Sequence, residues 1–470
     1  MGEEQGLKAN KSNFQEWYAE VLNKADMIDY SQVKGFHILK PWSYFIWEQV
    51  MEWFNKELKK YGVDNAYFPL VMPKSLIEKE KEHVEGFAPE ILTCTKAGDD
   101  DLEEELYIRP TSEMIIYDSF TKWIRSWRDL PLKINQWCNI IRWEKQTNPF
   151  LRPREFLWQE GHCAFATQEE ALADQMYALK LYEKIYKELF AIPMILGEKT
   201  PAERFAGADK SFSPETVLPD GRTIQAGTSH YLGQNFSKAL GITFLNEKGK
   251  SEYAYQTSWG ISIRSIGVMI LAHGDDKGLV LPPRLAKYQV VIVPIYKDDT
   301  KELVLKEARK LAKSIKARVF IDESNKSPGW KFNHWELKGV PLRIELGPRD
   351  IEKKQVVVAK RTGGKSFIKV KDLDVKALLE EFHNELFDNA VKVLKSKVKK
   401  VETKTELYKT IKDGFVAKAC WCGDPEHEIK LKNDLGAKSA NMPFNEQLFS
   451  KTCAFCKDKA KYVVLYSKQY

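Results

Sequence analysis

The sequence has no long hydrophobic run and contains few cysteines. None of its apolar stretches approaches the ~18 residues that a membrane-spanning helix requires, so we expect no membrane partner. Residues Met1–Gly6 contain neither a basic nor an apolar segment, which predicts that no secretory signal is present and that the protein is cytoplasmic. The seven cysteines, an odd number, are then expected to be reduced thiols rather than a disulfide framework.

The sequence also lacks the two common glycine-rich nucleotide-binding loops. It contains no G-x-x-x-x-G-K-[ST] segment, and no G-x-G-x-x-G segment follows an expected strand. In such loops, backbone N–H groups at the start of a helix hold the phosphates. Their absence argues against the P-loop and Rossmann modes of nucleotide binding, so side chains would have to hold any bound nucleotide.

The chain is large enough to bury several cores, and its charge is unevenly distributed. Its 470 residues, 43% of them apolar, predict two to four domains. Residues 287–400 carry 27 Lys and Arg against 16 Asp and Glu, whereas residues 1–286 carry 34 against 41. A basic domain of this kind indicates a polyanionic partner, with RNA or DNA as the leading candidates. The alternative is a solvated lysine-rich surface.

Two expected breaks divide the chain into three blocks. Turn residues over Asp275–Pro283 and a run rich in Lys and Val over residues 392–405 predict domains at residues 1–285, 286–395 and 396–470. In the first block, four-residue apolar spacing predicts a helix over Pro41–Lys60, followed by a strand over Ala66–Val71. Thr167 begins a capping-box pattern that predicts a long helix to about residue 190.

The second block alternates strands and helices. We expect strands over residues 289–295, 318–322, 341–346 and 355–360, a helix over residues 300–316 and a final helix. This order predicts a compact α/β domain.

The most informative segment is an expected hairpin, with strands over residues 132–143 and 155–164 and a loop over residues 144–154. Strand alternation places Phe156, Trp158, Glu160 and His162 on one face of the second strand. The first strand and the loop add further charged residues, which are Arg142, Glu144, Arg152 and Arg154. Because unpaired buried carboxylates are costly, we expect these groups to line a wet cleft. The alternative is an ion-paired surface hairpin.

Arginine binds phosphate bidentately, and Phe156 could stack on a purine. The expected hairpin is therefore compatible with a nucleotide held on an antiparallel sheet. Two further segments, Gln225–His230 and Trp259–Gly267, bring additional polar groups and another arginine, Arg264, at the start of an apolar helix.

These residues resemble the class II aminoacyl-tRNA synthetases. Arg142-Trp143-Glu144 with Arg152 is similar to motif 2, Gly260–Arg264 to motif 3, and the Pro41 helix with Pro69 to motif 1, the dimerisation element. More narrowly, the chain resembles prolyl-tRNA synthetase of the archaeal and eukaryotic type. This likeness rests on the segments Arg109–Glu113, Phe156–His162, Gly227–His230, Pro328–Phe332 and Trp335–Gly339.

The resemblance implies an α+β catalytic domain with an antiparallel sheet flanked by helices, an α/β anticodon-binding domain and a small α/β zinc-binding C-terminal domain. It also implies a proline–tRNA ligase that uses ATP with Mg²⁺, L-proline and tRNA(Pro) and that forms a homodimer through the motif 1 helix. It implies a catalytic set of Arg142, Arg264 and Glu144. The implied proline-binding residues are Thr111, Glu113, Arg142, Trp158, Glu160, His162, Phe205 and His230. The implied ATP-binding residues are Arg142, Glu144, Arg152, Phe156, Gln225, Thr228, Ser262 and Arg264. The implied anticodon-binding residues are Glu336, Arg343, Arg349 and Asp350.

Cysteines crowd into the last fifty residues, which indicates a structural zinc site. The cysteines concerned are Cys420, Cys422, Cys453 and Cys456. The family pattern has a second cysteine five positions after the first, and this sequence has His427 there. We therefore expect the ligands Cys422, His427, Cys453 and Cys456, with Cys420 in place of His427 as the alternative.

Two other functions remain open at this point. A synthetase for threonine or glycine shares the three class motifs, but Thr111, Glu113 and the Trp158–His162 wall argue against it. A non-catalytic RNA-binding relative typically loses the phosphate-binding arginines, whereas Arg142, Arg152 and Arg264 are all retained. The sequence does not indicate whether the protein joins a larger synthetase complex.

Overall fold

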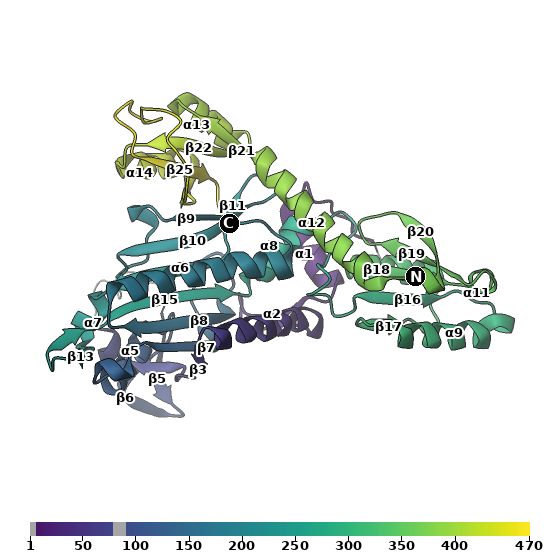
Figure 1. Cartoon of the computed structure of the whole chain (residues 1–470), viewed down its shortest axis with the longest axis horizontal. Helices are drawn as coiled ribbons and strands as arrows, with labels where there is room; N and C mark the ends of the chain where they lie inside the picture. Colours follow the sequence, from purple (N-terminus) through teal and green to yellow (C-terminus); the bar gives the residue numbers. More distant parts are fainter. Residues whose placement is uncertain (1–5, 79–90) are drawn as a thin grey trace.

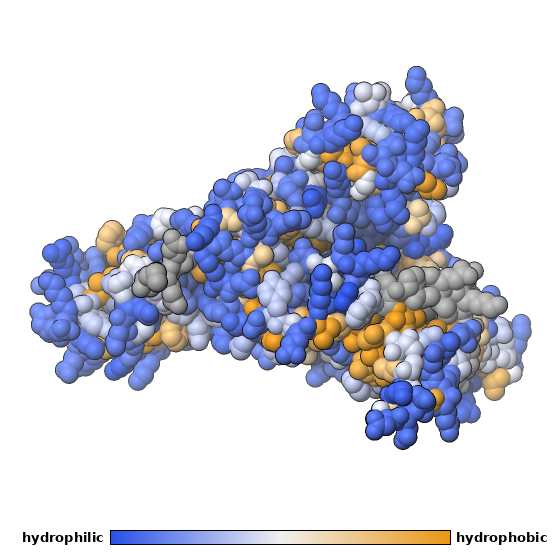
Figure 2. All heavy atoms as spheres, turned by 180° about the vertical axis from the view of Figure 1, so that it is seen from behind, coloured by the Kyte–Doolittle hydropathy of each residue, from blue (hydrophilic) through white to orange (hydrophobic). Residues whose placement is uncertain are grey.

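The computed structural model describes residues 6–78 and 91–470, so most of the segment considered for a secretory signal, Met1–Gln5, lies outside the described residues. Figure 1 shows a wide sheet with helices packed on it, a second part built around β16–β20, and a third part around β22 and β25. The long helix α12 (Val375–Lys397) runs between the second and third parts. In the described part of the chain, no helix is long and apolar enough to cross a membrane. The face drawn in Figure 2 is largely hydrophilic and carries a broad hydrophobic area.

The central sheet of the first part is mainly antiparallel. Its strand order is β24–β9–β10–β12–β15–β8–β7–β3, with β11 paired to β10, and only the short β3 runs parallel to its neighbour. The strands are β3 (Asp64–Asn65), β7 (Leu132–Ile141), β8 (Glu155–Phe165), β9 (Ile195–Glu198), β10 (Lys210–Val217), β11 (Thr223–Gln225), β12 (Thr228–Gly233), β15 (Tyr255–Ser262) and β24 (Met442–Pro443). The predicted antiparallel α+β catalytic fold is confirmed.

One face of this sheet is covered by α6 (Gln168–Ile185). The helix begins with the predicted capping box, in which the Glu170 N–H donates to the Thr167 hydroxyl at 3.3 Å and the Thr167 N–H donates to the Glu170 carboxylate at 3.1 Å. On the sheet, Gln159 accepts a hydrogen bond from Tyr182 of α6 at 3.0 Å. Because strand residues alternate between faces, Phe156, Glu160 and their even-numbered neighbours on β8 face the other side, where a cavity remains.

The motif 1 helix α2 spans Pro41–Lys60, as predicted, with Pro41 in its first turn and its apolar stripe buried. The predicted strand over Ala66–Val71 is wrong. The described strands here are β3 and β4 (Val71–Pro73). Between them, the side chain of buried Arg109 takes the carbonyl groups of Phe68 and Pro69 at 2.6 and 3.0 Å. Pro69 also has no N–H to donate to a ladder.

The first strand of the predicted hairpin ends earlier than expected. β7 stops at Ile141, so Arg142 and Glu144 do not lie on one strand face. Instead, the Glu144 N–H donates to the Arg142 carbonyl at 2.8 Å, which turns the chain, while the Arg142 N–H donates to the carbonyl of Arg154 across the loop at 2.8 Å. Backbone hydrogen bonds thus close the loop between β7 and β8 directly after Ile141.

The second part is the predicted α/β domain. Its sheet order is β17–β16–β18–β19–β20, with parallel pairing around β16 and antiparallel pairing beyond β18. The strands and helices are β16 (Val290–Pro294), α9 (Lys301–Ser314), β17 (Val319–Ile321), α10 (Pro328–Leu337), β18 (Leu342–Leu346), α11 (Pro348–Glu352), β19 (Gln355–Lys360) and β20 (Lys365–Lys369). Helices α10 and α11 and strand β20 were not predicted, although Ser327 as N-cap followed by Pro328 is a recognisable helix start.

Regular secondary structure spans most of the expected break over residues 392–405. Helix α12 continues to Lys397, and β21 (Val398–Val401) follows it directly and pairs parallel with β22. In this run, Lys side chains can face solvent while Val side chains face the core, both at the end of a helix and in an edge strand. The third part contains the sheet β21–β22–β25–β23. Its remaining elements are α13 (Lys404–Lys412), β22 (Val416–Trp421), α14 (Glu426–Leu435), β23 (Lys438–Ser439) and β25 (Tyr462–Ser467).

The remaining described strands and α-helices belong to the first part of the molecule. They are α1 (Phe14–Lys24), β1 (Ile28–Tyr30), β2 (His37–Leu39), α3 (Lys74–Ile77), β5 (Leu92–Ala97), β6 (Asp100–Ile108), α5 (Glu113–Trp123), α7 (Asn235–Leu240), β13 (Thr243–Leu245), β14 (Ser251–Tyr253) and α8 (Arg264–His273).

Candidate active site, anticodon pocket and metal centre

A cavity of about 260 Å³ lies on the sheet face opposite α6. All the residues predicted to bind proline or ATP line it. They are Thr111, Glu113, Arg142, Glu144, Arg152, Phe156, Trp158, Glu160, His162, Phe205, Gln225, Thr228, His230, Ser262 and Arg264. Segments far apart in the sequence therefore meet in one hollow, and the alternative of a purely ion-paired surface hairpin is excluded.

Two of the cavity arginines are anchored by backbone carbonyl groups. Arg142 Nε donates to the carbonyl of Pro110 at 2.9 Å, and its guanidinium lies 5.6 Å from the ring centre of Phe156. Arg264 Nε donates to the carbonyl of Leu151 at 2.9 Å. These contacts use one edge of each guanidinium and hold it at the cavity wall.

The positively charged arginines in the cavity repel one another. The pKa of Arg264 is lowered, first by burial and then by the positive charges of Arg152 and Arg142. The carboxylate Glu144 lies 3.8 Å from Arg152 Nε and offsets little of this, since Arg152 is half exposed. Three clustered guanidinium groups favour a multiply charged anion such as a triphosphate, which neutralises them together.

The other end of the cavity contains a buried carboxylate–imidazole pair. Glu160 accepts hydrogen bonds from Ser112 at 2.5 Å, from Gln136 at 2.9 Å and from His162 at 2.9 Å. His162 Nδ1 lies 3.2 Å from the hydroxyl of Tyr117. Both residues line the cavity, but Glu160 and His162 are only 2% and 1% exposed, so solvent does little to compensate their charges. They compensate each other, as burial requires.

A flat wall closes this end of the cavity. The rings of Phe205 and His230 are stacked with their centres 4.5 Å apart, and His230 Nδ1 lies 2.8 Å from the hydroxyl of Ser211. The pKa of His230 is lowered to about 3, by burial first and then by the charges of His162 and Lys199. His230 is therefore neutral. Nearby, the Thr111 hydroxyl donates to Glu113, whose side chain is 4% exposed. Paired acceptors and a flat wall suit a small ring that carries an ammonium group.

The structure adds residues to the site and removes one. Lys199, Glu203, Ser211 and Ser258 also line the cavity, and sequence reasoning missed them because they stand on separate elements without a motif. Arg154 does not line it. Its guanidinium stacks on the indole of Trp143 at 3.9 Å and donates to backbone carbonyl groups, so Arg154 braces the loop.

A second cavity of about 240 Å³ lies in the α/β domain. Glu336 and Arg343 line it together with Lys360, Arg361 and Lys365. The Arg343 guanidinium donates to Glu345 at 3.0 Å and lies 4.1 Å from the ring centre of Phe332.

The other two predicted anticodon residues do not line this cavity. Arg349 and Asp350 belong to α11, where Asp350 accepts hydrogen bonds from the Gly347 N–H at 3.1 Å and from Gln355 at 3.3 Å. The structure therefore separates the four predicted residues into two groups.

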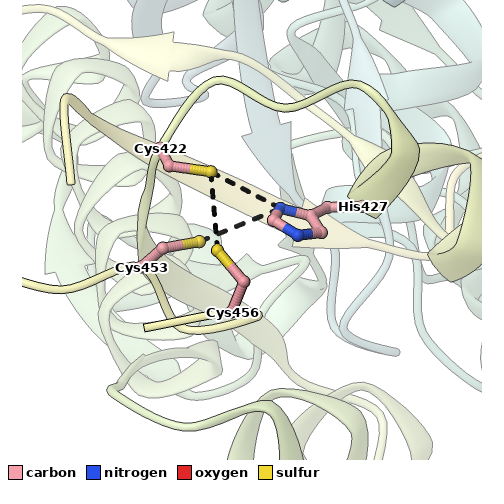
Figure 3. A group of neighbouring side chains, drawn as sticks. All are labelled: Cys422, His427, Cys453 and Cys456. Atoms are coloured by element: carbon pink, nitrogen blue, oxygen red, sulfur yellow. Dashed lines mark hydrogen bonds between the residues drawn. The ribbon is translucent and has the colours of Figure 1, made fainter. Parts of the chain in front are cut away.

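Four side chains of the third part form a cluster that can hold a metal ion. The ligand atoms of Cys422, His427, Cys453 and Cys456 all lie within 4.8 Å of one another (Figure 3). Cys422 Sγ lies 3.8 Å from Cys456 Sγ and 3.7 Å from His427 Nδ1. The alternative ligand, Cys420, instead accepts a hydrogen bond from the Ser450 N–H at 3.4 Å within the core. The predicted Cys₃His set is thus the one that converges.

Comparison with known families matches three segments of the chain. The family described as "tRNA synthetase class II core domain (G, H, P, S and T)" matches residues 93–273, and the "Anticodon binding domain" family matches residues 289–385. The family "Prolyl-tRNA synthetase, C-terminal" matches residues 405–470. Together with the antiparallel sheet and its cavity, these matches define a class II aminoacyl-tRNA synthetase.

Full-length relatives narrow the class. Proline–tRNA ligase 2 of Bacillus cereus (strain ATCC 10987 / NRS 248) is 47% identical over 474 residues, covering 99% of each chain. Proline–tRNA ligases of Clostridium botulinum (strain Loch Maree / Type A3) and Alkaliphilus oremlandii (strain OhILAs) are 44% and 46% identical, covering 97% of this chain and 97% and 96% of the relatives. The chain belongs to the prolyl-tRNA synthetase family of proline–tRNA ligases. The predicted resemblance is confirmed, and a threonine or glycine enzyme is excluded.

Proposed function

We propose that this chain activates L-proline with ATP to form prolyl-adenylate and then transfers proline to tRNA(Pro). The observation that supports this most directly is the single cavity in which three guanidinium groups lie beside a buried Glu160–His162 pair and a flat ring wall. One end suits a triphosphate and the other a cyclic ammonium. A cavity with both ends is what a reaction between an amino-acid carboxylate and ATP requires.

In the first step, the carboxylate of proline attacks the α-phosphate of ATP in line and pyrophosphate leaves. Such a reaction depends on orientation and charge neutralisation rather than on a nucleophilic side chain. Arg142 bridges the carboxylate and the α-phosphate. Its guanidinium lies 5.6 Å from the ring centre of Phe156 and 5.7 Å from that of Trp158, in the cavity that Arg152 and Arg264 also line. Arg152 and Arg264 neutralise the outer phosphates, with Glu144 orienting Arg152.

The nucleoside occupies the part of the cavity near motif 2. Phe156 stacks on the adenine ring. The remaining contacts to ATP come from polar side chains that line the cavity, which are Glu144, Gln225, Thr228 and Ser262. Mg²⁺ enters as part of the substrate, bound to the phosphates of ATP.

Proline occupies the acidic end. Thr111 and Glu113 accept its two N–H bonds, with the Glu160–His162 pair nearby. The ring lies among flat side chains, which are Trp158, His162, Phe205 and His230. Because this pocket selects by shape, its discrimination against similarly small side chains is expected to be weak.

The α/β domain binds the anticodon of tRNA(Pro). Lysines position the phosphate backbone, while base edges are read by forked or carboxylate side chains. Glu336 and Arg343 read bases in the second cavity. Arg349 and Asp350, which belong to α11, contact the anticodon strand of the RNA. We assign residues 1–285 to catalysis, 286–395 to anticodon binding and 396–470 to the C-terminal domain, with α12 crossing the second boundary.

The Cys₃His cluster holds one structural zinc ion. Zn–S bonds of about 2.3 Å in a tetrahedron place two sulfur atoms about 3.8 Å apart, and the Cys422–Cys456 separation is 3.8 Å. The ion would cross-link the loops after β22 and before β25. His427 is also stacked on Phe455, with ring centres 4.8 Å apart, which orients its imidazole toward the cysteines.

The protein forms a homodimer through α2 and the neighbouring strands β1 and β2. Apolar side chains there remain exposed in the single chain, with Tyr30 and Val33 each 53% exposed and Ile38 51% exposed. A second copy that covers them would account for this exposure. We place the protein in the cytoplasm, where its thiols stay reduced.

Amino-acid-dependent exchange between ATP and pyrophosphate, measured with each of the twenty amino acids, tests the proposed function. Proline should give the highest kcat/KM. No exchange with any amino acid would favour a non-catalytic RNA-binding protein, and a maximum with another amino acid would refute the assignment of the pocket.

A further inference from the structure

The C-terminal domain supplies a strand to the catalytic sheet. Its strand β24 pairs antiparallel with β9, with Met442 opposite Glu198 and Pro443 opposite Gly197. The approach is so close that a Cβ on Gly197 would lie 2.5 Å from the carbonyl oxygen of Met442. Strand β9 leads directly into Lys199, Glu203 and Phe205, which line the active-site cavity. One short segment thus touches the C-terminal domain on one side and the cavity on the other.

Lys199 is held by both domains. Its ammonium group, with the side chain 4% exposed, donates one hydrogen bond to Glu215 of the catalytic sheet and one to the carbonyl of Ala440 in the C-terminal domain, each at 2.7 Å. A buried ammonium group is stable only when its N–H bonds are satisfied. The position of Lys199 therefore depends on the C-terminal domain.

The next residues make further contacts with the C-terminal domain. The hydroxyl of Thr200 donates to Glu428 of α14 at 2.9 Å and lies 2.9 Å from the hydroxyl of Ser439. Glu203 pairs with Lys438 at 2.9 Å. Lys199, Thr200 and Glu203 therefore each contact the C-terminal domain, at β23, at α14 or next to β24.

The same segment holds the flat wall of the amino-acid end. The Lys199 N–H donates to the carbonyl of Ser211 at 2.8 Å, and the Phe205 N–H donates to the Ser211 hydroxyl at 3.1 Å. That hydroxyl lies 2.8 Å from His230, on which Phe205 is stacked. A displacement of residues 199–205 would therefore move the wall that packs against the substrate ring.

We propose that the C-terminal domain is a structural part of the amino-acid pocket and that Lys199 and Thr200 are positioning residues through which it sets the specificity of activation. This inference rests on the proposed function only for the identity of the amino acid. Lys199 and Thr200 act on the Ser211–His230–Phe205 wall of the amino-acid end, and their substitution leaves untouched the separate contact between Thr223 of β11 and Ser467. The effect should therefore appear in amino-acid binding and leave ATP binding unchanged.

Thr200 offers the most conservative test, since it does not line the cavity. Thr200→Val keeps the volume and removes the hydroxyl, whereas Thr200→Ser keeps the hydroxyl. We expect Thr200→Val to raise the KM for proline about threefold to tenfold, as the loss of a buried hydrogen bond implies, with the KM for ATP changed less than twofold. The ratio of proline to alanine activation should fall. Thr200→Ser should restore both values.

Lys199 provides a second, independent test. Because Lys199→Met leaves Glu215 buried without its cation and can prevent folding, the double variant Lys199→Met/Glu215→Gln, which removes both charges, is measured beside it. Either variant that folds should raise the KM for proline. Lys122→Met, which removes an exposed cation paired with Asp118, is the control and should change neither KM.

Thermal unfolding of each variant separates positioning from stability alone. A lowered Tm with an unchanged KM for proline in Thr200→Val would overturn the proposal, as would equal increases in both KM values. The wild-type exchange assay separately tests the proposed function. If another amino acid proves to be the substrate, its KM is compared across the same variants.

Discussion

His162 Nε2 lies 2.9 Å from Glu160 Oε2, and both side chains are almost fully buried on one face of β8. Burial by itself lowers the pKa of His162, but the hydrogen bond and negative charge of Glu160 outweigh burial and raise it overall. Burial likewise raises the pKa of Glu160, but His162, Ser112 and Gln136 outweigh this and lower it. Both shifts favour the charged forms of the two side chains, and they place a carboxylate paired with an imidazolium at the amino-acid end of the cavity.

This pair predicts a defined pH dependence of stability. The contribution of His162 is fully present below its unfolded pKa of about 6.5 and is lost as the pH rises through its raised folded pKa. The contribution of Glu160 is present above about pH 4.3 and is lost as the pH falls through its lowered folded pKa. Glu160→Gln should therefore destabilise the protein most near pH 5–6, by about 3 kcal/mol, and progressively less at alkaline pH. Thermal unfolding of wild type and Glu160→Gln from acidic to alkaline pH measures this loss of stability. A difference in stability that does not depend on pH would contradict the charged pair.

The three cavity arginines predict opposite effects on the free and the nucleotide-bound protein. Arg152→Gln removes one of the charges that oppose Arg264, so the free protein should be no less stable than wild type. The same change should raise the KM for ATP by about tenfold or more and reduce the rise in Tm on adding ATP, because a charge-assisted phosphate contact is lost. Arg128→Gln, on a surface helical turn, is the control. A KM for ATP equal to wild type in Arg152→Gln would remove Arg152 from the nucleotide site.

The second cavity predicts that tRNA recognition can be separated from amino-acid activation. Arg343→Ala should lower kcat/KM for tRNA charging by about tenfold or more, since a contact to a base edge is lost. Proline-dependent pyrophosphate exchange should remain nearly unchanged. Arg309→Ala, which breaks an exposed ion pair in the same domain, should affect neither assay. Equal losses in both assays would show that Arg343 supports the fold rather than the anticodon.

The cysteine cluster predicts which thiols bind metal. The purified protein should contain about one zinc per chain. Cys456→Ser should lose this zinc. Cys420→Ser should retain it, because Cys420 Sγ accepts a hydrogen bond from the Ser450 N–H and lies outside the cluster. Elemental analysis measures the metal, and thermal unfolding should show a lower Tm for Cys456→Ser only. Zinc lost from Cys420→Ser and kept by Cys456→Ser would reverse the assignment.

Much of the local structure follows from local patterns. Pro41–Lys60 is helical because apolar residues recur every four positions behind a proline in the first turn, and Thr167 begins α6 through a capping box. Alternation along β8 placed Glu160 and His162 on the cavity face. Each of these depends on neighbours within a few residues, which the sequence displays directly.

Predictions failed where distant groups took over hydrogen bonds. Residues 66–70 do not form a strand, because the side chain of Arg109 occupies carbonyl groups that a ladder would use. Arg154 was expected in the cavity, but stacking on Trp143 draws it away. The run over residues 392–405, predicted as a domain break, contains the end of α12 and the edge strand β21, which pairs with β22.

The amino-acid sequence by itself determined the family, the four metal-cluster residues and the residues that meet in the catalytic cavity, because motifs and spacing carry that information along the chain. Only the tertiary structure decided that Glu160 and His162 neutralise each other in burial, that Lys199 enters the cavity wall, and that the C-terminal domain adds a strand to the catalytic sheet. The physical reason is the same in each case. The free energy of a buried charge or an edge strand depends on which groups folding brings beside it. Burial makes Glu160 and His162 pair with each other, whereas Lys199 and β9 take partners from Glu215, Ala440 and β24.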